Sequence, residues 1–257
     1  MSLVEGESWT RWLHDVRRIE FDAAIAHIRL GEHSTALELG CGDGFQLNLL
    51  RQRLARVFGI DPRRLPASPS GCAFAYAESL PFPDGVFDLV FSCHVVEHIQ
   101  DRALAMAEAV RVVRPGGYIV HIVPTQFWKV TSLLLNPVGY PMRVWEKWRQ
   151  LRERHQDKNP PETLKHEESR PGLFQVLGRW FYPPIHGSFP SHRSEFQSYG
   201  QEIWRAVFHR ACLSPVAEVP LLSYTQFGFL RFRLLGLRSR LAHHGFAASL
   251  AFIFQKT

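Results

Sequence analysis

Short apolar runs alternate with stretches of helical spacing along the first 124 residues. The runs predict five strands, near residues 35–39, 56–60, 72–76, 87–92 and 117–123. Between and before them, apolar residues at helical spacing predict a helix over 8–29, capped by Ser8, and another starting at Asp101. Pro115-Gly116-Gly117 is expected to end that second helix and turn the chain into strand five. This alternation is typical of a doubly wound, Rossmann-like α/β sheet.

The pattern changes after Pro124 and resumes near residue 199. Tyr199 to Phe208 predicts a helix with a buried stripe, Val216 to Leu222 a sixth strand, and Ala248 to Phe254 a seventh that returns antiparallel. The expected architecture is therefore a seven-stranded sheet with an insertion. We expect an N-terminal helical segment at 1–30, a Rossmann-like domain at 31–124 and 197–257, and an inserted acceptor-binding or lid element at 125–196.

The loop after the first strand carries the strongest chemical signal. Ala36 to Gly44 reads ALELGCGDG, a buried strand followed by glycine at every second position. This spacing is neither the G-x-G-x-x-G of dinucleotide sites nor a P-loop. The carboxylates of Glu38 and Asp43 would repel a pyrophosphate and suit a cationic ligand such as S-adenosylmethionine. Asp61, about twenty residues further on, is placed either to accept hydrogen bonds from a ribose diol or to cap a helix before Pro62.

Further motifs follow in order. They are Ala77 to Val90 (AESLPFPDGVFDLV), His94 to Ile99 (HVVEHI) and Arg114 to Gly117 (RPGG). Together with the glycine loop they resemble class I S-adenosylmethionine-dependent methyltransferases of the type 11 group, which includes ubiquinone and menaquinone biosynthesis enzymes. The resemblance is close from about residue 35 to 124 and extends only in outline over the rest.

The resemblance implies roles for the matching residues. Glu38, Gly40, Cys41 and Gly42 would line the methionine end of the cofactor, and Asp61 with Pro62 its ribose. Tyr76, Ala77 and Glu78 would meet the adenine, and His94 would lie near the transferable methyl group. The family commonly has an aspartate where this chain has Tyr76, so adenine recognition departs from the family pattern here.

Three histidines are candidates for the proton acceptor that a hydroxyl substrate requires. His94 comes first by position, and His98 and His186 follow; each has a structural role as its alternative. His94, Glu97 and His98 also fall at i, i+3 and i+4, a spacing that some relatives use to bind a divalent metal through Glu-x-x-Glu-His. Here histidine replaces the first glutamate, and we expect no metal.

Composition and charge bear on the expected partners and location of the protein. The net charge of +6 favours anionic partners. No secretory signal or membrane-spanning window is evident, and the four cysteines show no metal or disulfide spacing, so we expect a reduced, cytoplasmic protein. Leu230 to Leu241 places leucines on one helical face with arginines beside it. That segment is either a helix lying on the inner face of a membrane or a surface helix packed on the domain.

These observations predict a methyltransferase that acts on a small acceptor held by the insertion. We expect methylation at oxygen, because a hydroxyl acceptor needs a base such as histidine. The acceptor is expected to be amphiphilic, of lipid-linked, quinone or sugar type. Two alternatives stay open. One is a nucleic-acid methyltransferase, for which no binding module is visible, and the other is an S-adenosylmethionine-binding protein without catalysis.

Overall fold

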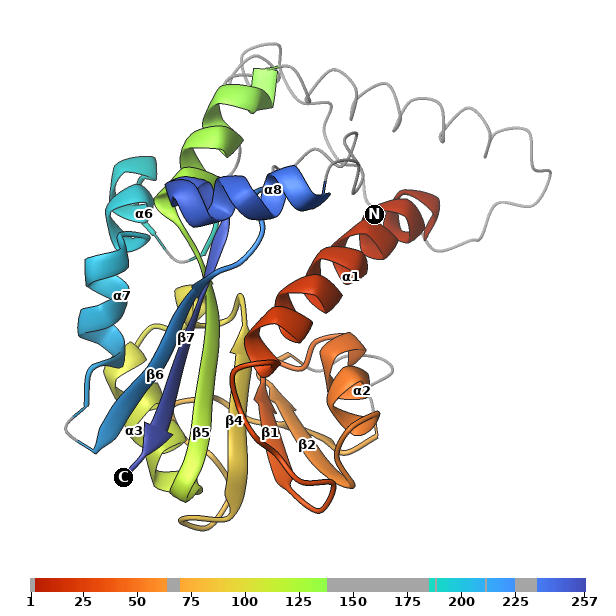
Figure 1. Cartoon of the computed structure of the whole chain (residues 1–257), viewed down its shortest axis with the longest axis vertical. Coiled ribbons are helices and arrows are strands. Elements are labelled where there is room, and N and C mark those ends of the chain that lie inside the picture. Colours follow the sequence, from red (N-terminus) through yellow and green to blue (C-terminus); the bar gives the residue numbers. More distant parts are fainter. Residues whose placement is uncertain (1–2, 64–69, 138–184, 188, 211, 225–234) are drawn as a thin grey trace, which may run out of the picture.

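A single seven-stranded sheet forms the centre of the protein (Figure 1). The computed structural model describes residues 3–63, 70–137, 185–187, 189–210, 212–224 and 235–257. The strand order is β3-β2-β1-β4-β5-β7-β6. The strands are β1 (Thr35–Leu39), β2 (Arg56–Asp61), β3 (Cys72–Phe74), β4 (Phe87–Cys93), β5 (Val113–Pro124), β6 (Leu213–Pro220) and β7 (Ser249–Lys256). Strands β1 to β5 are parallel and β7 is antiparallel to both its neighbours, which confirms the predicted Rossmann-like sheet.

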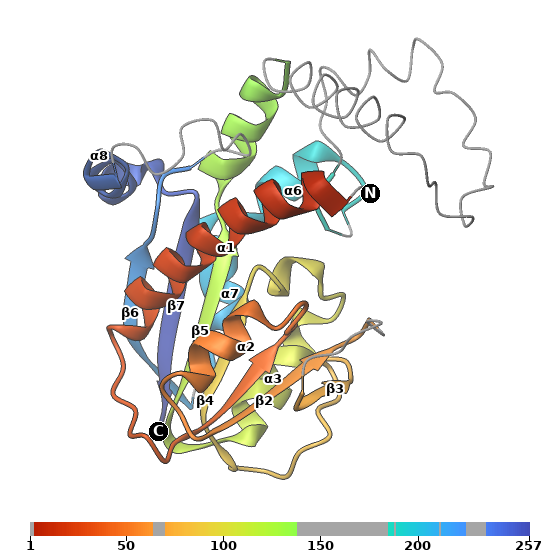
Figure 2. The same cartoon turned by 90° about the vertical axis from the view of Figure 1, so that its right-hand side faces the viewer.

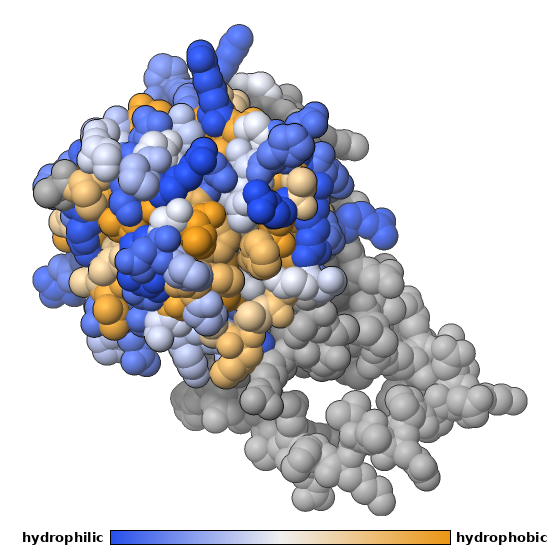
Figure 3. Space-filling model, turned by 90° about the horizontal axis from the view of Figure 1, so that it is seen from below, coloured by the Kyte–Doolittle hydropathy of each residue, from blue (hydrophilic) through white to orange (hydrophobic). Residues whose placement is uncertain are grey.

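Helices cover both faces of the sheet (Figures 1 and 2). One face is packed by α1 (Leu3–Ile25) and α2 (Phe45–Arg51), and the other by α3 (Arg102–Val112) and α7 (Gln201–Phe208). A helix over 126–137, α6 (His192–Ser198) and α8 (Leu235–Leu241) lie toward the upper end in Figure 1. Because β1 to β5 run parallel, their carboxyl ends meet at one edge of the sheet, where ligands bind in such folds. Seen from below, the opposite end carries hydrophilic side chains around a smaller apolar group (Figure 3).

The helix before β5 ends earlier than we predicted. Val112 is its last residue, and Val113 already has the extended conformation of β5. Val113 pairs with Phe87 and Tyr118 with Leu89, so the residues between them, including Pro115-Gly116-Gly117, form an irregularity within the strand. The prediction that this motif separates helix from strand was wrong, because pairing with β4 extends the strand back past it.

Other element bounds shifted for similar reasons. The first helix begins at Leu3 and ends at Ile25, so Ser8 lies inside it and does not cap it. β3 stops at Phe74, two residues short of the predicted end. β6 begins at Leu213 and is an edge strand, where Pro215 and Pro220 are tolerated because one side of the strand has no partner.

Cys41 and Cys72 are joined by a disulfide bond, contrary to our interpretation of the cysteine spacing. The bond links the glycine loop after β1 to the first residue of β3, two segments separated by 31 residues. This pairing cannot be predicted from the spacing of the cysteines, because the two residues come together only through the side-by-side order of β1, β2 and β3. Cys93 and Cys212 are free thiols.

Part of the predicted insertion lies outside the described residues, as do Leu230 and Leu234 of the proposed membrane segment. Its last turns are present as α8, in which Leu237 and Leu241 are exposed. Among the helices that the structure describes, none combines the length and the apolarity needed to cross a bilayer.

Candidate active site

The glycine loop passes close under the end of β4. Gly40 has a φ of 71°, and a Cβ atom there would lie 2.4 Å from a methyl carbon of Val95. No other residue fits this position, because a side chain would both strain the backbone and collide. The loop therefore places backbone, and not side chains, against the space at the carboxyl ends of β1 and β4.

Two carboxylates flank this loop in different electrostatic states. Glu38 is 1% exposed, and burial together with Asp43 and Asp61 raises the pKa of its carboxyl to about 8. Asp61 accepts from the backbone N–H of Gly42 at 3.0 Å and from the exposed guanidinium of Arg63. Although burial opposes it, Arg63 lowers the pKa of Asp61. The Glu38 carboxyl is thus mainly neutral near pH 7, whereas Asp61 is ionised and paired with the exposed guanidinium of Arg63.

The predicted adenine-side residues lie beyond the end of β3. The Tyr76 side chain is 56% exposed and meets Phe74 edge to face, with ring centroids 6.0 Å apart. Ala77 is buried, Glu78 half-buried, and Pro62 exposed. The aromatic ring of Tyr76 is thus available at the surface, where it could stack on a planar ligand.

The N-terminal helix closes over the same loop. His14 of α1 lies 2.8 Å from Asp43, and its ring stacks on Phe45 at 3.9 Å between centroids. This contact joins α1 to the glycine loop and to the start of α2. The helix therefore packs on the sheet with its second half and reaches the ligand loop with its first.

His94 occupies a strained position directly after β4. Its φ of 55° makes it the one non-glycine residue with positive φ among the described residues. Such a conformation costs about 1–3 kcal/mol and persists only where surrounding contacts impose it. It turns the ring between two buried carboxylates, with Nε2 3.6 Å from Glu20 and Nδ1 3.5 Å from Glu97. Burial and Arg17 oppose protonation, but these two carboxylates together raise the pKa of His94.

Glu20 is the residue that our sequence analysis missed. It is fully buried on α1 and accepts from Arg17 at 2.7 Å, from the Tyr224 hydroxyl at 3.1 Å and from the Ser249 hydroxyl. Burial alone would raise the pKa of Glu20, yet Arg17 and His94 lower it to about 2.

A signal for Glu20 does exist in the sequence. Val16, Glu20 and Ala24 are four residues apart on one helix face, and both apolar members are buried. An acid in the middle of a buried stripe indicates a partner inside the protein.

Glu97 connects His94 to the other two predicted histidines. Its carboxylate lies 3.8 Å from His186, whose ring meets that of His98 at 4.6 Å between centroids. Although burial opposes it, His186 and His94 lower the pKa of Glu97. The structure therefore brings His94, His98 and His186 around one carboxylate, with His186 at the solvent side, 41% of its side chain exposed.

Metal-ligand atoms also converge here, in a different set from the spacing we considered. Val96–His98 is a short 3₁₀ turn, and His94 lies outside it, so His94, Glu97 and His98 do not share a helical face. Glu97, His98 and His186 instead bring ligand atoms within 4.8 Å of one another. A carboxylate and two imidazoles could hold a divalent cation.

Several buried polar atoms at this edge have no hydrogen-bond partner among the described residues. They are Oε2 of Glu38, Nε2 of His94 and both carboxylate oxygens of Glu97. Buried polar groups in proteins are almost always hydrogen-bonded, so such a cluster of exceptions is typical of a ligand-binding site. By contrast, Cys93 is buried with its pKa raised by burial and is not an activated thiol.

This fold and loop define a class I methyltransferase-type domain, and comparison with known proteins agrees. Residues 37–121 match the methyltransferase domain family Methyltransf_11. A probable S-adenosylmethionine-dependent methyltransferase from Mycolicibacterium smegmatis is 31% identical over 97 residues, 35% of this chain and 38% of that protein. A ubiquinone biosynthesis O-methyltransferase from Pseudomonas paraeruginosa is 31% identical over 153 residues, 54% of this chain and 60% of that protein.

The matched region thus spans less than two thirds of either relative. A solved structure, the complex of the Haloferax volcanii Trm112 methyltransferase activator with a putative methyltransferase, aligns with a TM-score of 0.54 and 16% identity over 96% of this chain and 94% of that one. At that identity the similarity concerns the fold alone. Over residues 37–121 the chain is therefore similar to the Methyltransf_11 methyltransferase domain, and its sheet has the Rossmann-like fold of methyltransferases of known structure.

Proposed function

We propose that this protein transfers a methyl group from S-adenosylmethionine to a hydroxyl oxygen of a small acceptor. The observation that supports it most is the cluster of buried polar atoms without a hydrogen bond, within the described part of the chain, on Glu38, His94 and Glu97, at the carboxyl edge of the sheet, where ligands bind in such folds. A cofactor on the Glu38 side and a hydroxyl on the His94 side would satisfy these atoms together.

The residues around the glycine loop fit the cofactor. The buried Glu38 carboxyl would pair with its ammonium group, and the bare backbone at Gly40 permits close approach. Asp61 would hold the ribose once the exposed Arg63 side chain moves aside. When bound, the cofactor would supply an electrophilic methyl carbon, which the acceptor oxygen attacks in line with the sulfur that leaves as part of S-adenosylhomocysteine.

His94 is proposed as the proton acceptor for the hydroxyl. The oxygen loses its proton to an imidazole nitrogen of His94, and the resulting imidazolium is stabilised by Glu20 and Glu97 on its two sides. At 3.6 and 3.5 Å these contacts exceed ordinary hydrogen-bond lengths, so a hydroxyl can compete for the nitrogen. Glu20 and Glu97 are then positioning residues, which orient the ring and tune its basicity.

His186 and His98 form the outer wall of this proposed acceptor site. Trp128 lies beside His186, with ring centroids 5.3 Å apart, and the Tyr199 hydroxyl donates to the His186 carbonyl. Aromatic side chains with a few polar groups suit a phenol, a quinone precursor or a sugar. Proton transfer to His94 requires no metal, so we expect a chelator to leave the rate unchanged. Loss of activity that returns with Mg²⁺ would instead assign Glu97, His98 and His186 to a metal site.

The acceptor is proposed to be amphiphilic and reached from the cytoplasmic face of a membrane. The support comes from α8, where exposed Leu237 and Leu241 stand beside Arg238 and Arg240, and from the basic net charge. Flotation with vesicles of phosphatidylglycerol tests this proposal. Absence of binding to these vesicles at low salt would refute the membrane proposal and leave the methyltransferase proposal intact.

A substitution of His94 separates catalysis from cofactor binding. Asparagine tolerates positive φ and cannot act as a base, so His94→Asn preserves the backbone. We expect S-adenosylhomocysteine to bind His94→Asn as it binds the wild type, while methyl transfer falls by about 100-fold or more. His33→Asn, at an exposed loop position, is the matched control.

Two other outcomes would contradict the proposal. Absence of S-adenosylhomocysteine binding in a calorimetric titration would refute the proposed cofactor. Unchanged methyl transfer in His94→Asn would refute the proposed role of His94 as the base. Steeply salt-dependent RNA binding accompanied by RNA methylation would favour a nucleic-acid methyltransferase instead.

A further inference from the structure

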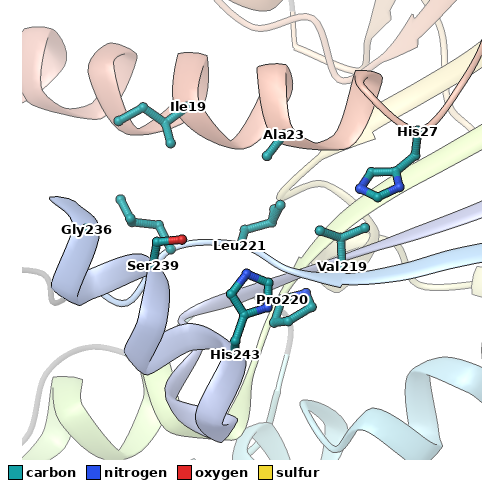
Figure 4. A pocket seen from close by; sticks show the side chains of 10 residues that line it. Ile19, Ala23, His27, Val219, Pro220, Leu221, Gly236, Ser239 and His243 are labelled. Atoms are coloured by element: carbon teal, nitrogen blue, oxygen red, sulfur yellow. The ribbon is translucent and has the colours of Figure 1, made fainter.

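A cavity of about 530 Å³ opens beside α1. It lies between α1, the end of β6 with the residues that follow, and α8 (Figure 4). Its size falls within the range of small-molecule sites in proteins. None of the residues predicted for cofactor or catalysis lines it.

The walls of this groove are mainly apolar. Ile19 and Ala23 are four residues apart on α1 and face the groove, and His27 follows two residues after the helix ends (Figure 4). Val219 and Leu221 form the opposite side. An elongated aliphatic group would fill such a space by burying its methylene groups against these side chains.

The polar groups around the groove are neutral or basic. His27 approaches from the end of α1 and His243 from beyond α8, and both rings point toward the space between the helices (Figure 4). Ser239 adds a hydroxyl, while Arg238 and Arg240 are its neighbours on α8. No acidic side chain is among the described residues that line the groove. This distribution complements an anionic head group.

The groove is separate from the proposed active site, although the two share α1. Ile19 faces the groove and the next residue, Glu20, faces His94. Leu222 lines the groove, and Tyr224, two residues further on, donates to Glu20. A molecule in the groove would therefore contact the wall of the active site without entering it.

We infer that this groove binds the alkyl chain of an anionic amphiphile, with its head group at His27 and His243. Leu237, Leu241 and Phe246 are exposed on α8 and just after it, near the groove-lining Ser239 and His243 in the sequence, and such exposed apolar side chains suit loading from a lipid surface. The inference concerns a second site and holds or fails independently of methyl transfer.

Binding of a fluorescent fatty acid to the full chain tests this inference without cofactor or acceptor. We expect the emission of cis-parinaric acid to rise on binding, and dodecyl phosphate to displace it at least about tenfold more effectively than dodecanol. Inorganic phosphate alone should not displace it. Equal displacement by dodecanol, or displacement by phosphate alone, would overturn the inference, as would the absence of any rise in emission.

Two substitutions locate the site. Ser239→Trp should fill the groove from exposed α8, and His243→Ala should remove a head-group contact. Each should lower the affinity for cis-parinaric acid by about tenfold. His244→Ala, an exposed neighbour that does not line the groove, is the control and should bind normally. Normal binding by folded Ser239→Trp and His243→Ala would overturn the inference.

Vesicles then distinguish a membrane lipid from a free amphiphile as the source of the chain. If phosphatidylglycerol vesicles remove the probe from the wild type and phosphatidylcholine vesicles do not, the site takes an anionic membrane lipid. If only soluble dodecyl phosphate removes it, the site takes a free amphiphile. Either result supports the anionic alkyl ligand. A protein that binds the probe but transfers no methyl group would leave this site standing and remove the proposed function.

Discussion

Replacing Glu20 by glutamine should move the pH dependence of methyl transfer. The Glu20 carboxylate lies 3.6 Å from Nε2 of His94, and it helps to raise the pKa of that ring above its usual value of 6.5. At an effective dielectric constant of ~20, a unit charge at this distance is worth about 4–5 kcal/mol. That energy corresponds to about three pKa units, since one unit is about 1.4 kcal/mol.

The direction follows from the charge that is removed. A base works only when neutral, so kcat/KM of the wild type should rise with pH to a plateau above the raised pKa of His94. In Glu20→Gln the positive Arg17 remains beside the ring without the carboxylate, so the pKa of His94 falls. Water entry and movement of Arg17 reduce the full effect, and we expect the rising limb to move down by at least about one unit.

The assay is kcat/KM against pH for the wild type, Glu20→Gln and Glu202→Gln. The last makes the same chemical change on exposed α7 and should leave the profile unmoved. Breaking the Arg17–Glu20 pair also costs stability, up to about 3–5 kcal/mol, so folding is checked by thermal melting at each pH. A folded Glu20→Gln protein with an unshifted limb would refute the account of His94, whatever its rate.

Three further predictions rest on other parts of the site. Because the pKa of Glu38 is raised to about 8, cofactor binding at pH 7 should release a proton, and the affinity for the cofactor should rise with pH up to about 8. Calorimetry in two buffers of different ionisation enthalpy measures this proton release, and equal binding heats in the two buffers would contradict the prediction. Gly40→Ala should abolish S-adenosylhomocysteine binding, whereas Gly116→Ala, also at positive φ but with open space around it, should cost only about 1–2 kcal/mol of stability. Lys129→Met removes the nearest cation from the buried Glu195 carboxylate and leaves it with His192 at 3.7 Å, so it should lower the free energy of unfolding in urea by about 3–5 kcal/mol. Exposed Arg205→Met should unfold almost as the wild type; equal losses would count against this prediction.

The sheet could be predicted because its central strands are buried on both faces. Runs such as Phe87 to Cys93, in which every residue is buried and only Asp88 and Ser92 are polar, give short, mainly apolar segments that indicate buried strands. Strand ends were less predictable, since they depend on pairing with strands distant in the sequence. Val113 belongs to β5 because Phe87 lies beside it, and no local pattern shows that.

The candidate site could be predicted from the sequence where its residues lie close together in one segment of the chain. The glycine loop and the positions of His94, Glu97 and His98 follow from a single strand and its loop. Glu20 lies 74 residues before His94 in the chain and reaches its ring only in three dimensions, so no local pattern shows the contact. His186 was a candidate from the sequence, but its place beside the Glu97 carboxylate is visible only in the structure. The Cys41–Cys72 bond is a similar case.

The proposed reaction is methyl transfer to a hydroxyl group of an amphiphilic acceptor. The most direct measurement is incubation of the protein with methyl-labelled S-adenosylmethionine and a total extract of the cells that make it, followed by separation of lipid and aqueous phases. The account predicts label in the lipid phase with the wild type and its loss with His94→Asn. A wild-type protein that binds the cofactor yet leaves both phases unlabelled would contradict it.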